Sequence, residues 1–188
     1  MGSIGRKRRK TEQEEVAIKH LKTLIKTSIA HSCKRCPLRL YNDKDYTITL
    51  GVGNIQAGKI IILPKYDTNA KIGYLSILKI LEEEYNKITS NHIYEDYYIT
   101  RQIKCYSYNN FNMDLIAREC CKDHLIYEIV RIRPKLIINF DKDLDFPECG
   151  IRRIDVISPA VMYYDNQSLK DKFVEQLSKA IYDTDLCV

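Results

Sequence analysis

The chain has 188 residues, of which 45% are hydrophobic and 29% are charged, and its formal net charge is +5. This length and composition suit one globular domain, and the short apolar runs exclude a membrane-spanning helix. The basic N-terminus has no apolar stretch after it, so we expect no signal peptide and a cytoplasmic protein. Seven cysteines in such a chain favour metal binding over disulfides.

We expect a basic tail over residues 1–10 and a single domain over residues 11–188. A capping box at Thr11–Glu14 predicts a first helix that ends near Ser32. Helical spacing of apolar residues predicts three further helices, at Tyr74–Ile88, Asp114–Arg131 and Leu169–Ala180. Alternating or continuous apolar runs predict the strands Thr47–Leu50, Lys59–Leu63, Tyr97–Thr100, Lys135–Phe140 and Asp155–Ser158, and Gly51–Asn54 reads as a turn.

Strands and helices alternate along the chain, which predicts a three-layer α/β/α sandwich with a central parallel sheet. Ligands of such folds bind beyond the carboxyl ends of the strands. The loops after Leu63, Thr100, Phe140 and Ser158 are therefore where functional residues are expected.

Four cysteines carry the most specific pattern in the chain. Cys33 and Cys36 form a Cys-x-x-Cys turn, and Cys105 and Cys121 follow far downstream. Thiolates are the ligands that hold an iron–sulfur cluster or a structural zinc ion, and four of them complete either site. The sequence therefore predicts a metal site that joins distant segments.

These cysteines and the motifs around them resemble the iron–sulfur uracil-DNA glycosylases of types 4 and 5, from about Cys33 to Tyr182. The matching motifs are Cys33-x-x-Cys36-Pro-Leu, Gly51-x-Gly53-Asn54-x-x-Ala57, Tyr98-Ile-Thr-x-x-x-Lys104-Cys105, Cys121-x-x-x-Leu125, Arg133-Pro-Lys-Leu-Ile-Ile138 and Ser158-Pro-Ala160. The resemblance implies a uracil-DNA glycosylase-like fold. It also implies a [4Fe–4S] cluster on the four cysteines that supports DNA-binding loops, with zinc as the alternative metal. Cys120 is interpreted as a buried neighbour of the ligand Cys121.

The catalytic motifs of that family are replaced in this chain. Its Gly-Glu-x-Pro-Gly loop corresponds to Pro64–Thr68, where Asp67 is the one candidate for orienting a water molecule. The amide that reads the uracil edge is replaced by Arg101, and the histidine that stabilises the departing uracil by Ser158. Because a glycosylase must read the flipped base and stabilise its leaving group, we expect no uracil excision.

Several residues are candidates for binding DNA. The tail cluster can contact phosphates, or it can be a solvated end; it consists of Arg6, Lys7, Arg8, Arg9 and Lys10. Arg152 and Arg153 approach the loop that follows Ser158, and Tyr163 and Tyr164 in that loop are candidates for a wedge between bases.

Three hypotheses follow. The first is a non-catalytic glycosylase-like protein that keeps its cluster and binds DNA, a replication or repair partner, or both. The second is a divergent DNA glycosylase that removes uracil or another damaged base. The third is a structural or inhibitory module that binds a protein and makes no contact with DNA.

Overall fold

The computed structural model describes residues 36, 51–67, 70–104, 111–144 and 150–183. The basic tail, the predicted first helix, the predicted strand Thr47–Leu50 and the two cysteines Cys33 and Cys105 lie outside these residues. Within the described ranges, no helix is both long enough and apolar enough to cross a membrane.

A five-stranded sheet forms the centre of the described part, in the order β1-β5-β2-β6-β7. Its strands are β1 (Val52–Gly53), β2 (Lys59–Leu63), β5 (Tyr98–Arg101), β6 (Leu136–Asn139) and β7 (Arg152–Asp155). A separate small hairpin is made by β3 (Tyr66–Asp67) and β4 (Ile72–Gly73). The helices are α3 (Tyr74–Thr89), α4 (Ile93–Asp96), α5 (Phe111–Ile132), η1 (Pro159–Tyr163) and α6 (Gln167–Tyr182).

Four of the five strands run parallel, and only β1 is antiparallel to its neighbour β5. The chain passes from β2 to β5 on one side and then to β6 on the other side of β2. Such a reversal of strand order places a binding crevice outside the carboxyl ends of the strands in open α/β sheets. The pairings Leu63 with Arg101 and Ile62 with Asn139 bring the ends of β2, β5 and β6 to one edge.

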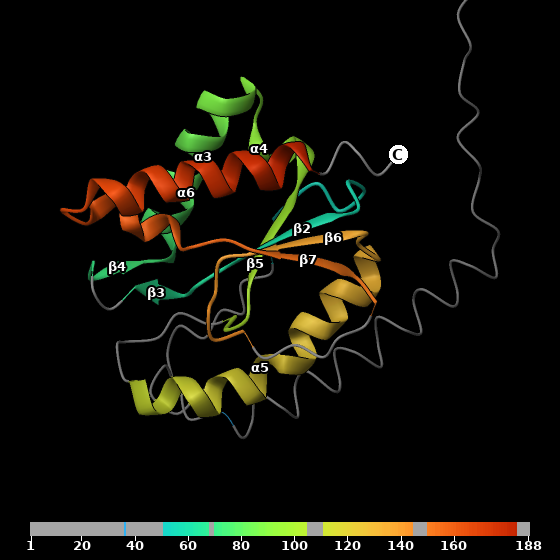
Figure 1. Cartoon of the computed structure of the whole chain (residues 1–188). Helices are drawn as coiled ribbons and strands as arrows, with labels where there is room; N and C mark the ends of the chain where they lie inside the picture. Colours follow the sequence, from blue (N-terminus) through green and yellow to red (C-terminus); the bar gives the residue numbers. More distant parts are fainter. Residues whose placement is uncertain (1–35, 37–50, 68–69, 105–110, 145–149, 184–188) are drawn as a thin grey trace, which may run out of the picture.

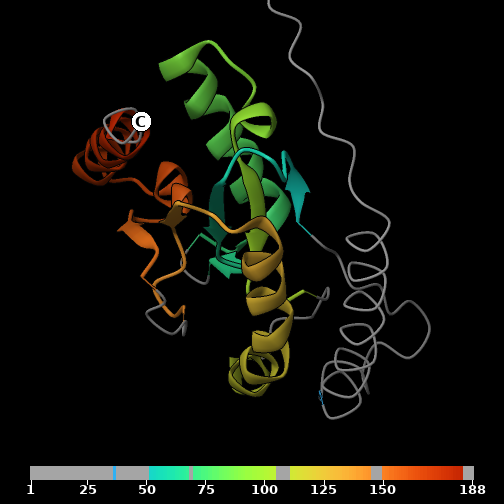
Figure 2. The same cartoon turned by 90° about the vertical axis from the view of Figure 1, so that its right-hand side faces the viewer.

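Helices cover both faces of this sheet, as Figures 1 and 2 show, with α3 and α6 on one side and α5 on the other. Successive side chains of a strand point to opposite faces. Ile61 and Leu63 of β2 therefore pack in the larger core cluster with α3 and α6, whereas Ile60 and Ile62 pack against α5. All four side chains are fully buried, which explains why β2 is a continuous apolar run.

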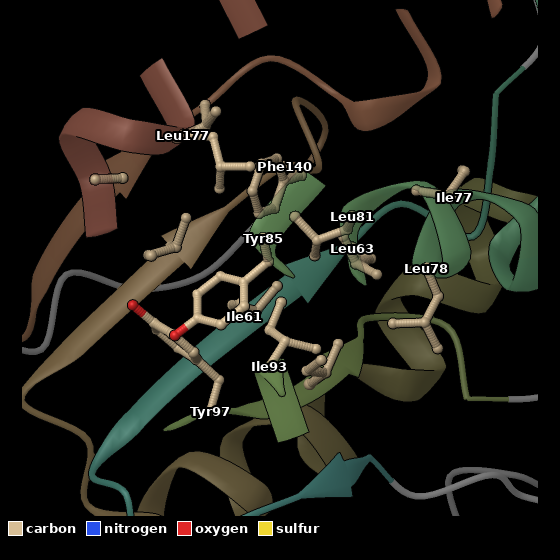
Figure 3. Packing of buried hydrophobic residues seen from close by; sticks show 14 of the residues in the cluster. Ile61, Leu63, Ile77, Leu78, Leu81, Tyr85, Ile93, Tyr97, Phe140 and Leu177 are labelled. Atoms are coloured by element: carbon tan, nitrogen blue, oxygen red, sulfur yellow. The ribbon is translucent and has the colours of Figure 1, made fainter. Parts of the chain in front are cut away.

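Aromatic side chains pack against one another in the larger core cluster, part of which Figure 3 shows from close by. Tyr85 of α3 meets Tyr97 edge-to-face with ring centroids 5.8 Å apart, and Phe140 lies 6.3 Å from Phe173 of α6. Each such pair stabilises the fold by about 0.5–1.5 kcal/mol in addition to the stabilisation that comes from burying its apolar surface. These contacts fix both helices on the sheet and so fix the loops at its carboxyl edge.

The predicted α/β architecture with a central, mostly parallel sheet is confirmed, but two assignments are wrong. Asp155–Ser158 is not a strand, because the strand ends at Asp155 and Ser158 instead accepts a hydrogen bond from the Ala160 N–H at the start of η1. Gly51–Asn54 is not only a turn, because Val52 and Gly53 pair with β5. Gly53 has φ 101° and a Cβ added there would lie 2.3 Å from the Tyr97 carbonyl oxygen, so this pairing requires glycine.

Candidate functional site

The carboxyl edge of the sheet is occupied by buried charged side chains. Lys65 follows β2, Arg101 ends β5, and Asp141 lies two residues beyond β6. All three are buried, at 9%, 9% and 3% exposure. Charged residues are rarely buried unless other groups compensate their charge. Their partners therefore decide what this edge can bind.

Arg101 lies against an aromatic ring. Its guanidinium carbon is 4.4 Å from the centre of the Tyr74 ring, and one of its nitrogens donates to the Lys104 carbonyl oxygen at 3.5 Å. Burial raises the pKa of Tyr74, and the nearby Arg101 charge opposes this rise. The end of β5 is thus filled by a cation that is stacked on an aromatic ring.

Asp67 is held by two donors. The Tyr164 hydroxyl lies 2.9 Å from each of its carboxylate oxygens, and the Ala70 N–H donates to Oδ1 at 2.7 Å. These contacts tie β3 to the segment after η1. They also occupy the carboxylate that the sequence offered as a water-orienting group. Tyr164 is half-buried in this contact, whereas Tyr163 is exposed.

The Tyr164 contact gives a first testable expectation. Replacing Tyr164 by phenylalanine removes the hydroxyl that donates to the Asp67 carboxylate. Hydrogen bonds to charged groups contribute about 1.5–3 kcal/mol to the free energy of unfolding. We expect the free energy of unfolding to fall by about that amount in a urea titration. Tyr163→Phe is the matched control and should change it little, since that side chain is 59% exposed. Equal effects of the two substitutions would contradict the assigned role of Tyr164.

The two arginines of β7 are exposed and each has an acidic partner. An Arg153 nitrogen lies 2.7 Å from an Asp155 carboxylate oxygen, and an Arg152 nitrogen lies 3.8 Å from Asp183. Exposed ion pairs of this kind contribute little and exchange readily with solvent. The arginines therefore remain accessible to an anionic partner.

A buried polar network centred on Glu128 joins β5 to α5. Glu128 Oε2 accepts from Thr100 Oγ1 at 2.6 Å and from Lys104 Nζ at 2.5 Å. Its Oε1 accepts from the Tyr98 hydroxyl and from the Gly51 N–H, each at 3.1 Å. Burial lowers the pKa of Lys104, and the Glu128 charge opposes that effect. The carboxylate is thus satisfied by four donors, which is what a buried charge requires.

Two of the four predicted metal ligands converge beside this network. Cys36 and Cys121 are both buried and lie in one small cluster with Ile103 and Ala117. Cys120, predicted to be buried, is only half-buried and packs against this cluster. Ile103 is two residues before the predicted ligand Cys105. No group of three or more metal-ligating residues is found among the described residues, which do not include Cys33 and Cys105. Two neighbouring thiols have the ligand chemistry of a thiolate metal site, and buried thiols also pack as small apolar side chains.

A second buried network, on Asp141, was not predicted from the sequence. Arg118 of α5 donates to both Asp141 carboxylate oxygens, at 2.9 and 3.3 Å, and to Gln102 Oε1 at 2.8 Å. This network fixes α5 to the ends of β5 and β6. The network on Glu128 did leave a sequence signal, because helical spacing places Glu128 on the apolar face with Cys121 and Leu125.

The structure thus defines a class of protein: a mixed α/β domain with a mostly parallel sheet, and with buried charges and clustered cysteines near its carboxyl edge. No family model matches the chain, and a comparison with curated proteins finds no match.

Proposed function

We propose that the protein is a non-catalytic relative of the iron–sulfur uracil-DNA glycosylases that binds DNA, a replication or repair partner, or both. The observation that carries this proposal is the placement of Arg101. Its buried guanidinium stacks on Tyr74 at the end of β5. An amide offers a donor and an acceptor to the edge of uracil, whereas a guanidinium offers donors only. Binding of DNA requires neither the amide nor the lost histidine.

The other two aligned positions support the same proposal. Asp67 already accepts hydrogen bonds from Tyr164 and Ala70. The Ser158 hydroxyl accepts from the Ala160 N–H at 3.2 Å and so caps η1. A neutral hydroxyl in that role supplies no positive charge to a departing base. The alternative of a divergent glycosylase would give Asp67 and Ser158 a second role beside these contacts.

The cysteine site is proposed to hold a [4Fe–4S] cluster, with zinc as the alternative metal. Cys33, Cys36, Cys105 and Cys121 would be its ligands. The burial of Cys36 against Cys121 across a long stretch of chain supports this assignment. The cluster would supply a structural cross-link, because metal-binding free energy is also folding free energy in such sites.

DNA binding is proposed to use the basic tail, Arg6 to Lys10, together with Arg152, Arg153 and the exposed Tyr163. Exposed cations bind phosphates by releasing counterions, so affinity falls steeply with salt. An exposed aromatic ring can stack on or wedge between bases.

The test uses the full, metal-loaded chain with oligonucleotides that contain one uracil. We expect DNA retention that falls steeply with salt, and no abasic sites after alkaline cleavage. Loss of one preorganised group for leaving-group charge costs about 100- to 1,000-fold in rate, and here two groups are replaced. Uracil release by the unmodified protein would overturn the non-catalytic assignment.

Two variants sharpen this test. Arg152→Gln with Arg153→Gln should reduce the salt slope of DNA binding, whereas Lys79→Gln is a control in α3 on an exposed surface. Arg101→Asn with Ser158→His restores the two family residues and tests for a gain of uracil excision. Binding to DNA with no salt dependence, or no binding at all, would favour the protein-binding module instead.

A further inference from the structure

The amino ends of the parallel strands carry a row of cations. Lys59 begins β2 and Arg152 begins β7, and both are in register with Leu136, the first residue of β6. Lys135 directly precedes Leu136. Neighbouring strands lie about 4.8 Å apart, so three adjacent strands present cations close together along one edge.

Two further cations lie where α5 ends and the chain enters this edge of the sheet (Figure 1). Arg131 is in the last turn of α5, and Arg133 follows the helix. The Arg133 N–H donates to the Ile129 carbonyl oxygen at 2.8 Å. The Lys135 N–H donates to the Gly58 carbonyl oxygen, also at 2.8 Å, which ties this turn to the start of β2. Together these cations form the amino-edge cluster, which consists of Lys59, Arg131, Arg133, Lys135 and Arg152.

Much of the positive charge in the amino-edge cluster has no acidic neighbour. Three of its members are exposed and form no ion pair with any described residue, namely Arg131, Arg133 and Lys135. Lys59 lies over the Tyr97 ring at 5.5 Å, and Arg152 lies 3.8 Å from Asp183. The acidic side chains of α4 precede β5 and so lie on the other side of β2.

Arg133 has a backbone conformation that favours glycine. Its φ is 50°, in the left-handed region, directly after a helix, where glycine is the common residue. A Cβ makes this conformation unfavourable, so an arginine here costs stability relative to glycine. Backbone strain of this kind is typical of residues whose side chains have a function.

The chemistry of this surface favours a nucleic-acid backbone over a protein partner. Phosphates bind exposed cations by releasing counterions and need no apolar contact. The interface cores of protein partners are instead depleted of charge and enriched in aromatic side chains. Between residues 130 and 135, Val130 is the only exposed apolar side chain, which is too little for such a core.

We propose that the amino-edge cluster binds the phosphate backbone of a nucleic acid, on the edge of the sheet opposite to its carboxyl edge. The inference goes beyond the proposed function, because only Arg152 is shared with the DNA contacts proposed above and the cysteine site plays no part in it. Phosphate contacts carry no sequence information. The amino-edge cluster therefore holds nucleic acid without regard to sequence or to the presence of uracil.

The test compares the two ends of β6 in the full chain. Arg133→Gly with Lys135→Gln removes two charges at the amino end, whereas Lys142→Gln removes one exposed charge beyond the carboxyl end of the same strand. Arg131 stays unchanged, because a cation in the last turn also stabilises the helix. Binding to DNA duplexes with and without uracil is measured by fluorescence anisotropy in a salt titration.

The expected result is a smaller dependence of the affinity on salt. Each phosphate contact contributes about 0.9 to the slope of log affinity against log salt, so the double variant should lower the slope by about 1.8 for both duplexes. Lys142→Gln should leave the slope unchanged. Arg133→Gly alone should lower it by about 0.9 without lowering the melting temperature, since glycine suits the left-handed backbone.

Three results would overturn the inference. An unchanged slope in the double variant, with a lower slope in Arg152→Gln with Arg153→Gln, would overturn the amino-edge site and keep the DNA binding proposed above. Unchanged DNA binding by the double variant, with weaker binding of polyglutamate, would assign the cluster to an acidic protein instead. A wild-type chain that binds no DNA would overturn both this inference and the proposed DNA binding.

Discussion

Replacing Glu128 by alanine is expected to lower the free energy of unfolding by about 3–5 kcal/mol. The carboxylate is the acceptor for Lys104, Thr100, Tyr98 and the Gly51 N–H, and it is almost wholly buried. Removing one partner of a buried ion pair leaves the other charge without compensation, which is the costly case. The expected loss would be read from urea unfolding of wild type and variant under identical metal loading.

Glu119→Ala is the matched control for this experiment. Glu119 lies on the same helix but is exposed, so its removal should change the free energy of unfolding by less than about 0.5 kcal/mol. Glu128→Gln should cost less than the alanine variant, because the amide keeps an acceptor for the hydroxyls. A Glu128→Ala variant as stable as wild type would mean that the network on Glu128 does not hold β5 to α5.

Replacing Cys121 by serine is expected to abolish metal binding and most of the stability that depends on it. A serine hydroxyl does not replace a thiolate as a soft ligand. Iron and sulfide content should fall close to zero, and the brown colour of the anaerobically purified protein should be lost. Because the proposed metal would join segments far apart in sequence, thermal unfolding should occur at a lower temperature.

Cys120→Ser is the control, since Cys120 precedes Cys121 and packs at the edge of the same cluster. It should retain the metal. If Cys120→Ser loses the metal and Cys121→Ser keeps it, the ligand assignment is wrong. If the wild-type protein is colourless and contains stoichiometric zinc, the proposed metal would be zinc instead of an iron–sulfur cluster. The assignment of the four cysteines as ligands would stay the same.

The sequence predicts the central strand β2 well because both of its faces are buried, so all of its inward positions are apolar. Lys59–Leu63 is predicted and observed with the same bounds, since its short apolar run is typical of a strand covered on both sides. The edges are harder. β7 has the sequence Arg-Arg-Ile-Asp, with three of its four side chains exposed, so no apolar pattern marks it. The predicted strand there was placed on the more apolar residues that follow.

For the candidate site, too, the sequence predicts some features and not others. Cysteines have a distinctive chemistry and spacing, so the grouping of Cys36 with Cys121 could be anticipated. The metal-binding roles of all four cysteines stay predictions. The pairing of Lys104 with Glu128 could not be anticipated, because it depends on how α5 packs on β5. The stacking of Arg101 on Tyr74 likewise depends on where α3 begins.

The position of β7 at the end of the described sheet has a consequence for self-association. An edge strand presents unpaired backbone groups that can join the edge of a second sheet, and natural proteins discourage this with charged side chains. Arg152, Arg153 and Asp155 place charges along this strand, and all three are exposed. Two copies that approach through β7 would have to strip water from these charges. The same arginines that are proposed to meet DNA thus also oppose strand-to-strand aggregation.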